Sequence, residues 1–200
     1  DERLPKLSDI YNAPIVPATV EFVDIAGLIA GASKGEGLGN KFLSHIREVS
    51  VIVHVARAFE SSDITHVENS VDPVRDIDTV STELILKDMD TLQGILARAE
   101  RDAKTGDKEK LKEVEVLRNL QKALNDGVML NTISEDVLDN PFVKGIGLLT
   151  AKPQLFLING SESDVTDELK AKIKELGGEY IAVNLNEVTN VENLIRRAYE

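Results

Sequence analysis

The chain has 200 residues, 42% of them hydrophobic and only 4% aromatic, and carries a formal net charge of −12 with no cysteine. Its length suits one domain, or one domain with an insertion, and its apolar content is sufficient for a core built mainly of valine, isoleucine and leucine. The composition excludes a disulfide framework, broad electrostatic binding of nucleic acid by this segment and, since no run of about 18 apolar residues occurs, a membrane-spanning helix.

The N-terminal part of the chain combines one apolar run with a glycine-rich segment. Residues 1–19 contain three prolines and are predicted to be irregular. Residues 20–24 are an apolar run that ends in an aspartate, which predicts a buried strand. Five glycines lie between positions 27 and 39, so residues 25–39 are too rich in glycine for a helix and are expected to form a mobile loop.

A short helix over residues 40–50 and a second strand over residues 51–56 are predicted next. This strand is continuously apolar except for His54, a pattern typical of parallel sheets that are covered on both faces. The three histidines match no zinc-binding spacing and no cysteine accompanies them, so we expect His54 to be a hydrogen-bonded core residue.

A helical hairpin is predicted over residues 76–128. Asp72 is a good N-cap, and Pro73 suits the first helical position. Apolar residues then recur at three- and four-residue steps on both sides of a break at residues 105–107, and two such helices should pack as an antiparallel coiled-coil pair. The two stripes are Ile85, Met89, Leu92, Leu96 and Ala99, followed by Leu111, Val114, Leu117, Leu120 and Leu124.

The last third of the chain returns to alternating helices and strands. This order predicts an α/β sheet with helices on both faces, divided as core (1–75), inserted hairpin (76–148) and core (149–200). The expected elements are a helix over 134–149 interrupted near Pro141, strands over 154–158 and 179–183, and helices over 167–176 and 191–199.

Residues 24–47, with the sequence DIAGLIAGASKGEGLGNKFLSHIR, resemble the switch II segment of the YchF subfamily of Obg-like ATPases, which are P-loop NTPases. The likeness continues at residues 63–67 and 71–73 and resumes at residues 150–153, so it covers nearly the whole chain. It implies a P-loop NTPase-like sheet and gives the glycine-rich loop a function, because such loops change shape when the terminal phosphate leaves.

The resemblance implies a function for three residues of this segment. Asp24 would support a Mg²⁺ ion through water, and the Gly27 amide would meet the γ-phosphate. Without such a function, Asp24 would simply cap the loop and Gly27 would be an ordinary turn glycine. Leu28 stands where many related hydrolases have a glutamine that orients the attacking water; a leucine cannot do so, and slow intrinsic hydrolysis is the expected consequence.

The segment Asn159-Gly160-Ser161-Glu162 follows the predicted strand over 154–158 and is the candidate base-recognition loop. GTPases of this class have Asn-Lys-x-Asp here, and the aspartate accepts hydrogen bonds from guanine. This chain has Gly160 for the lysine and Glu162 for the aspartate, similar to the Asn-x-x-Glu of YchF-like proteins, which favour ATP. Asn159 would bind the base edge or brace the loop, and Glu162 would lie near the base without making the guanine pair.

The phosphate-binding pattern G-x-x-x-x-G-K-[ST] does not occur in the sequence. Residues 1–4 resemble the D-x-R-L that follows switch I in the family, so we expect the sequence to begin inside the family pattern and to lack the phosphate loop and the C-terminal TGS domain. A sheet without its central strand would expose apolar faces and unpaired backbone groups, and an isolated chain of this kind should not hydrolyse ATP.

The resemblance therefore implies a cytoplasmic, Mg²⁺-dependent ATPase that associates with the ribosome, with no membrane or sequence-specific DNA partner. A ribosome contact would need a local basic patch or another domain. Two alternatives stay open: a GTPase of the same class, and a catalytically inactive interaction module whose working part is the hairpin.

Overall fold

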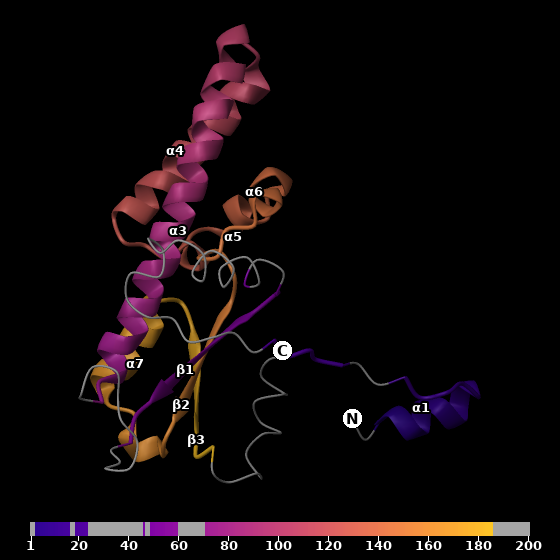
Figure 1. The fold of residues 1–200 in the computed structure, drawn as a ribbon. Coiled ribbons are helices and arrows are strands. Elements are labelled where there is room, and N and C mark those ends of the chain that lie inside the picture. The colour runs from indigo at the N-terminus through magenta and orange to yellow at the C-terminus, as the bar shows by residue number, and fades with distance from the viewer. Residues whose placement is uncertain (1–2, 17–18, 24–45, 47–48, 60–70, 186–200) are drawn as a thin grey trace.

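The computed structural model describes residues 3–16, 19–23, 46, 49–59 and 71–185. Its described part consists of a three-stranded sheet with a long helical hairpin that extends away from one end, as Figure 1 shows. A separate N-terminal helix, α1 (Arg3–Tyr11), lies away from this body. The α/β class predicted from the sequence is confirmed by this arrangement.

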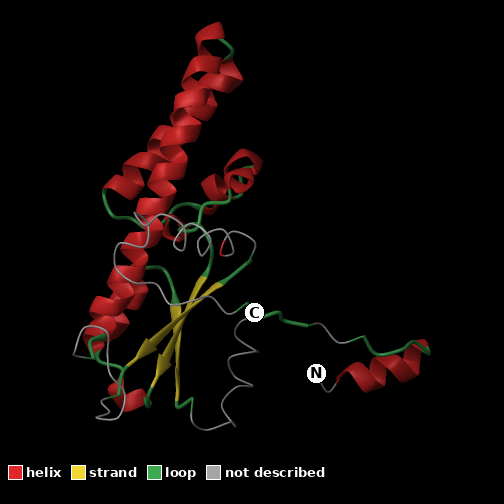
Figure 2. Cartoon of the chain, viewed as in Figure 1, coloured by secondary structure: helices red, strands yellow, loops and turns green. Residues whose placement is uncertain are grey.

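The sheet contains the parallel strands β1 (Ile52–Arg57), β2 (Gln154–Asn159) and β3 (Glu179–Val183), in that order (Figure 2). In β2 only Asn159 is not buried, because a neighbouring strand pairs with each of its edges. The strand pairs His54 with Phe156 on one side and Phe156 with Tyr180 on the other. Since all three strands run in one direction, their carboxyl ends meet at one edge of the sheet.

The hairpin is formed by α3 (Pro73–Asp102) and α4 (Lys108–Asn125). The Asp72 side chain caps α3 by accepting a hydrogen bond from the Arg75 amide at 3.0 Å, with Pro73 at the first helical position, as predicted. A 3-10 turn (Ala103–Thr105) ends α3, and Gly106 follows it with a φ of 80°, which favours glycine. The Asp107 carboxylate then caps α4 by accepting from the Glu109 amide at 2.8 Å.

Two apolar clusters stabilise the described fold. The hairpin cluster joins the facing sides of α3 and α4, where Leu92 and Leu117 are fully buried. The sheet cluster packs α7 (Asp167–Glu175) and the first turns of α3 on one face of the sheet, around Phe156 and Ile158. The chain between them forms a 3-10 turn (Leu130–Thr132) and the short helices α5 (Glu135–Leu138) and α6 (Pro141–Ile146).

A buried carboxylate links the hairpin to the sheet. Asp88, on α3, has no exposed surface and accepts hydrogen bonds from the amides of Leu149 and Thr150 at 3.0 and 2.7 Å. The Thr150 hydroxyl donates a third bond at 2.7 Å. These residues lie a few positions before β2, so Asp88 holds the middle of α3 against the start of the central strand. Beside it, Lys152 donates to the Val49 carbonyl at 2.7 Å.

The expectation for His54 is confirmed. It is 6% exposed, its Nε2 lies 2.9 Å from Gln154 Oε1, and its ring stacks on Phe156 with 4.6 Å between centroids. Burial lowers its pKa to about 4, and the hydrogen bond to Gln154 opposes that shift. His54 is therefore neutral at pH 7.

Two predictions for the N-terminal part are wrong. Residues 3–11 form a helix rather than irregular chain; Pro5 is tolerated because it lies in the first turn, where amides have no intrahelical acceptor. Residues 20–23 form no strand, and Phe22 and Val23 are 51% and 46% exposed. A strand needs a neighbour to complete its hydrogen bonds, and within the described part of the chain none pairs with this segment.

Two burial predictions also need correction. Among the described strands β1 lies at an edge of the sheet, and its Val55 is 65% exposed, so burial on both faces holds for β2 but not for β1. Leu111 shares the predicted apolar stripe of α4 but is 50% exposed, because it lies in the first turn of α4, close to the free end of the hairpin.

The predicted elements at 25–39 and 191–199, and nearly all of 40–50, lie outside the described residues. The division into 1–75, 76–148 and 149–200 stays a prediction.

Candidate functional site

The candidate base-recognition loop, residues 159–162, leaves the carboxyl end of the central strand β2. The end of β1 lies beside it, since Arg57 pairs with Asn159 in the ladder and the Ala58 amide donates to the Asn159 carbonyl at 3.1 Å. In open parallel sheets, ligands bind outside this edge. The loop is thus positioned where a nucleotide base could approach.

Asn159 and Gly160 tie the end of β2 to the end of β3. The Asn159 side-chain oxygen accepts a hydrogen bond from the Leu185 amide at 3.2 Å, and the Gly160 amide donates to the Val183 carbonyl at 3.0 Å. Asn159 was predicted either to bind the base edge or to brace the loop. Its Oδ1 contributes to bracing the loop. The interaction of Asn159 with a base stays a prediction.

Ser161 closes the loop through Asp164. The Ser161 amide and hydroxyl both donate to Asp164 Oδ2, at 2.8 and 2.6 Å. The hydroxyl bond, followed by the amide bond, lowers the pKa of Asp164 because both stabilise its charged form. A Cβ atom at Gly160 would lie 3.0 Å from the same carboxylate oxygen and 3.4 Å from the Ala58 Cβ, so a lysine would fit here only if Asp164 moved.

Glu162 is held by side chains of two other elements. The Tyr180 hydroxyl, from β3, donates to Glu162 Oε1 at 2.7 Å, and the Lys170 Nζ, from α7, lies 3.9 Å from the same oxygen. The hydrogen bond to Glu162 is the main cause that raises the pKa of Tyr180, since the charged partner favours the protonated phenol. The carboxylate is exposed but not unpartnered.

Asp24, Gly27 and Leu28 lie outside the described residues. The structure therefore brings Asn159, Gly160, Ser161 and Glu162 together, and the phosphate-side functions of the other three stay predictions. Within the part of the chain that is described, no three acidic or histidine side chains gather as metal ligands do.

Four residues beside the loop were not predicted from the sequence: Tyr180, Lys170, Asp164 and Arg57. Asp164 could have been found from its spacing, because a serine followed three residues later by an acid is typical of a capping box. Arg57 lies with its guanidinium carbon 5.5 Å from the centroid of the Phe59 ring. For Tyr180 and Lys170 the local sequence holds no signal, because their contact with Glu162 depends on how β3 and α7 pack.

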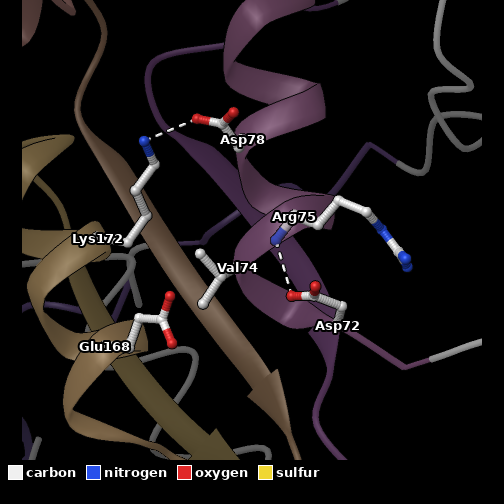
Figure 3. Close-up of a pocket in the computed structure, with 6 residues that line it drawn as sticks. All are labelled: Asp72, Val74, Arg75, Asp78, Glu168 and Lys172. Carbon is white, nitrogen blue, oxygen red and sulfur yellow. Dashed lines mark hydrogen bonds and ion pairs between the residues drawn. The ribbon is translucent and has the colours of Figure 1, made fainter.

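A separate, shallow pocket of about 420 Å³ lies between the first turns of α3 and α7 (Figure 3). None of the predicted site residues lines it. Its charges are largely paired within the protein: Lys172 lies 2.7 Å from Asp78, which raises the pKa of the lysine, and Arg75 lies 3.1 Å from Asp76. The lining residues are Asp72, Val74, Arg75, Asp78, Glu168 and Lys172. The Lys172–Asp78 ion pair joins α7 to α3, whereas the Arg75–Asp76 pair lies within α3.

The chain is similar in sequence to proteins that are described as ribosome-binding GTPases and ATPases. Residues 8–88 match the family described as "50S ribosome-binding GTPase". The chain is 46% identical over 180 residues to the ribosome-binding ATPase YchF of Bacillus subtilis, which covers 88% of this chain and 49% of that protein. It is 45% identical over 163 residues to the protein of the same name from Haemophilus ducreyi, covering 81% of this chain and 45% of that one. The chain thus spans about half the length of the curated relatives it matches.

The fold is likewise similar to a solved structure. The Schizosaccharomyces pombe YchF GTPase superimposes with a TM-score of 0.73 at 29% identity, over 100% of this chain and 59% of that one. The parallel sheet and the long helix pair are features that this likeness supports. None of the described helices has the length and apolarity that a bilayer crossing requires.

Proposed function

We propose that this chain, which belongs to the YchF family, acts in a cytoplasmic protein that binds ATP with Mg²⁺, hydrolyses it and associates with the ribosome. The two bacterial relatives named above are ribosome-binding ATPases, and the matched family is described by its 50S ribosome binding. The activity, the nucleotide and the ribosomal partner of the whole protein are all part of the proposal.

One observation carries the choice of nucleotide: the loop after β2 contains a glutamate whose carboxylate already accepts a hydrogen bond from Tyr180. Guanine presents two donors, N1–H and the N2 amine, to a carboxylate in this position. Adenine has neither donor, and its N1 is an acceptor. Because the Glu162 carboxylate already has a donor within the protein, guanine gains less from pairing with it, and this supports a preference for adenine.

On this proposal the described residues bind and orient the base. Asn159 and Gly160 fix the backbone at the ends of β2 and β3, and the Ser161–Asp164 pair stiffens the turn. Asp24, Gly27 and Leu28 would act at the phosphate side, where a bound Mg²⁺ would neutralise developing charge. Because Leu28 cannot orient water, hydrolysis is expected to be slow without another group that does so.

The test is a competition experiment on the whole protein. Labelled ATP is bound in the presence of Mg²⁺ and displaced with unlabelled ATP or GTP. We expect ATP to displace the label at a lower concentration than GTP. Displacement by GTP at a far lower concentration would overturn the adenine preference, and no binding of either nucleotide would overturn the proposal as a whole. Ribosome association is tested separately by co-sedimentation with purified subunits.

A GTPase of the same class is the second candidate. Two observations favour it: the chain keeps an acidic residue, Glu162, at the guanine-reading position, and both the matched family and the fission-yeast relative are described as GTPases. The same competition experiment separates the two candidates, because they predict opposite orders of affinity. The third idea, an inactive module that works through its hairpin, predicts that neither nucleotide binds.

A further inference from the structure

The Glu162 carboxylate is the meeting point of three separate elements. Glu162 lies in the 3-10 turn (Glu162–Asp164) after β2, Tyr180 lies in β3 and Lys170 lies in α7. Tyr180 donates to Oε1 at 2.7 Å, and the Lys170 ammonium lies 3.9 Å from that oxygen. Both partners therefore lie next to the same carboxylate oxygen, Oε1 of Glu162.

The partners are held in place by the core. Tyr180 pairs with Phe156 in the sheet, and its ring packs against the buried cluster between the sheet and α7. Lys170 follows Leu169, which has no exposed surface and whose amide donates to the Thr166 side chain in the helix cap. Because both backbones are fixed, the rigid Tyr180 ring presents its hydroxyl to Glu162 from a set direction, whereas Lys170 reaches Glu162 through a flexible side chain.

The loop backbone is fixed as well. The Ser161 amide and hydroxyl bind Asp164, and the Gly160 amide binds the Val183 carbonyl. Glu162 therefore cannot leave Tyr180 by a shift of the turn without breaking these bonds. Only rotation of its own side chain would free the carboxylate.

Guanine recognition by a carboxylate uses both oxygens, one for N1–H and one for the N2 amine. We propose that Tyr180, assisted by Lys170, is a specificity-determining residue: by donating to Oε1 of Glu162 it competes with guanine for that oxygen, weakens the bidentate pair and so favours adenine nucleotides. This inference rests on the proposed function and assigns the discrimination to a hydrogen-bond donor that lies outside the Asn159–Glu162 loop. Tyr180 acts through Glu162 and is thus a positioning residue.

The two partners differ in their expected weight. The Tyr180 bond is short and has a charged acceptor, the stronger class of hydrogen bond. The Lys170 contact is longer, and its side chains are 41% and 65% exposed, so it resembles the surface ion pairs that contribute little. Tyr180→Phe should therefore have a larger effect than Lys170→Gln.

The test compares the ratio of the GTP and ATP dissociation constants of the whole protein with that of its Tyr180→Phe variant. The variant removes one hydroxyl and keeps the ring that packs in the core. We expect the preference for ATP to fall by about three- to tenfold, the range of one hydrogen bond, through tighter GTP binding with ATP binding unchanged. Tyr11→Phe, at an exposed position on α1, is the matched control and should leave the ratio unchanged.

A second variant separates positioning from a general disturbance of the fold. In Glu162→Gln the side chain can no longer form the carboxylate pair with guanine, so adding Tyr180→Phe to it should not change the ratio further. The phenol titration of Tyr180, followed by absorbance, should shift to lower pH in Glu162→Gln, because the charged acceptor that raises its pKa is gone.

The outcomes are distinguishable. An unchanged ratio in Tyr180→Phe overturns this inference alone, as does a change of equal size in the Glu162→Gln background. Failure of the parent protein to bind either nucleotide overturns the proposed function and this inference with it. A lowered ratio that depends on Glu162 supports both.

Discussion

The hairpin and the sheet are stabilised in different ways. In the hairpin, Leu92 and Leu117 are buried by neighbours on two helices that are adjacent in sequence, joined by a tight turn at Gly106. In the sheet, β1 and β2 are about 100 residues apart, as the His54–Gln154 contact shows. The hairpin therefore depends on local periodicity, whereas the sheet depends on closing long loops between its strands.

The difference shows most clearly at positions of the same residue type. A leucine on the stripe of α4 is buried or exposed according to its distance from the free end of the hairpin, as Leu117 and Leu111 show. A valine or leucine in the sheet is exposed or buried according to whether its strand has neighbours, as Val55 and Leu157 show. Asp88 connects the two regions through the hydrogen bonds that it accepts from the amides of Leu149 and Thr150.

The largest effect is expected from breaking that link with Asp88→Ala. The change leaves the buried amides of Leu149 and Thr150 and the Thr150 hydroxyl without their acceptor, so the free energy of unfolding should fall by about 3–5 kcal/mol. Urea unfolding measures it. Asp90→Ala, at an exposed position on the same helix, should change the value by less than about 0.5 kcal/mol. Equal losses in the two variants would contradict a link between hairpin and sheet through Asp88.

Leu117→Ala tests the hairpin on its own. Leu117 is fully buried between α3 and α4, and the cavity left by the truncation should cost about 3 kcal/mol of stability. Leu111→Ala removes the same atoms from a half-exposed position of the same helix and should cost much less. Thermal or urea unfolding of both variants measures the two losses of stability. If Leu111→Ala lost as much stability as Leu117→Ala, the predicted stripe would be buried over its whole length.

Gly178→Ala tests the sheet. A Cβ atom there would overlap the Phe156 ring at Cε2 and would lie 3.0 Å from the Gln154 carbonyl oxygen, and Phe156 has no exposed surface into which it could move. Overpacking of this kind should destabilise the fold by up to about 3 kcal/mol. Gly145→Ala, where nothing lies within 4 Å of the new atom, is the matched control. Unfolding measurements that give both variants the same stability would contradict the close contact.

The pH dependence of stability tests the burial of His54. Its folded pKa of about 4 lies below the value of 6.5 that it takes when unfolded, so the unfolded chain binds the proton first. Its contribution is fully present above pH 6.5 and declines toward pH 4, with about 2 kcal/mol lost by pH 5. The His54→Gln variant lacks this titration. The difference in free energy of unfolding between parent and variant should therefore fall by about 2 kcal/mol between pH 7.5 and pH 5. A difference in free energy of unfolding that does not change with pH would mean that His54 is accessible to solvent.

The smallest effect has the opposite sign. Gly94 lies exposed in the middle of α3, and a Cβ atom there meets nothing within 4 Å. Gly94→Ala should raise the free energy of unfolding by about 0.5–1 kcal/mol, because alanine has the higher helix propensity. Gln93→Ala, at the neighbouring exposed position of the same helix, is a reference for a change without glycine and should have a smaller effect. A loss of stability in Gly94→Ala would show that α3 is less regular there than described.

Much of the fold could be predicted from the sequence because its signals are local. The Asp72–Pro73 cap, the break near Gly106 and the strand over 179–183 each depend on residues a few positions apart. The candidate loop could be located in the same way, since Asn159–Glu162 follows a buried strand. Its surroundings could not, because Tyr180 and Lys170 reach Glu162 from elements that only the packing of α7 and β3 brings near.

By itself, the sequence determined the start of α3, the turn between the hairpin helices and the strands near residues 154–158 and 179–183, since backbone hydrogen bonding and side-chain periodicity act within a few residues. The tertiary structure decided which apolar positions are covered, that Asp88 joins hairpin to sheet, and which donors occupy the Glu162 carboxylate. Burial and long-range hydrogen bonds depend on the positions of groups many residues apart, and those positions are set by packing the elements together.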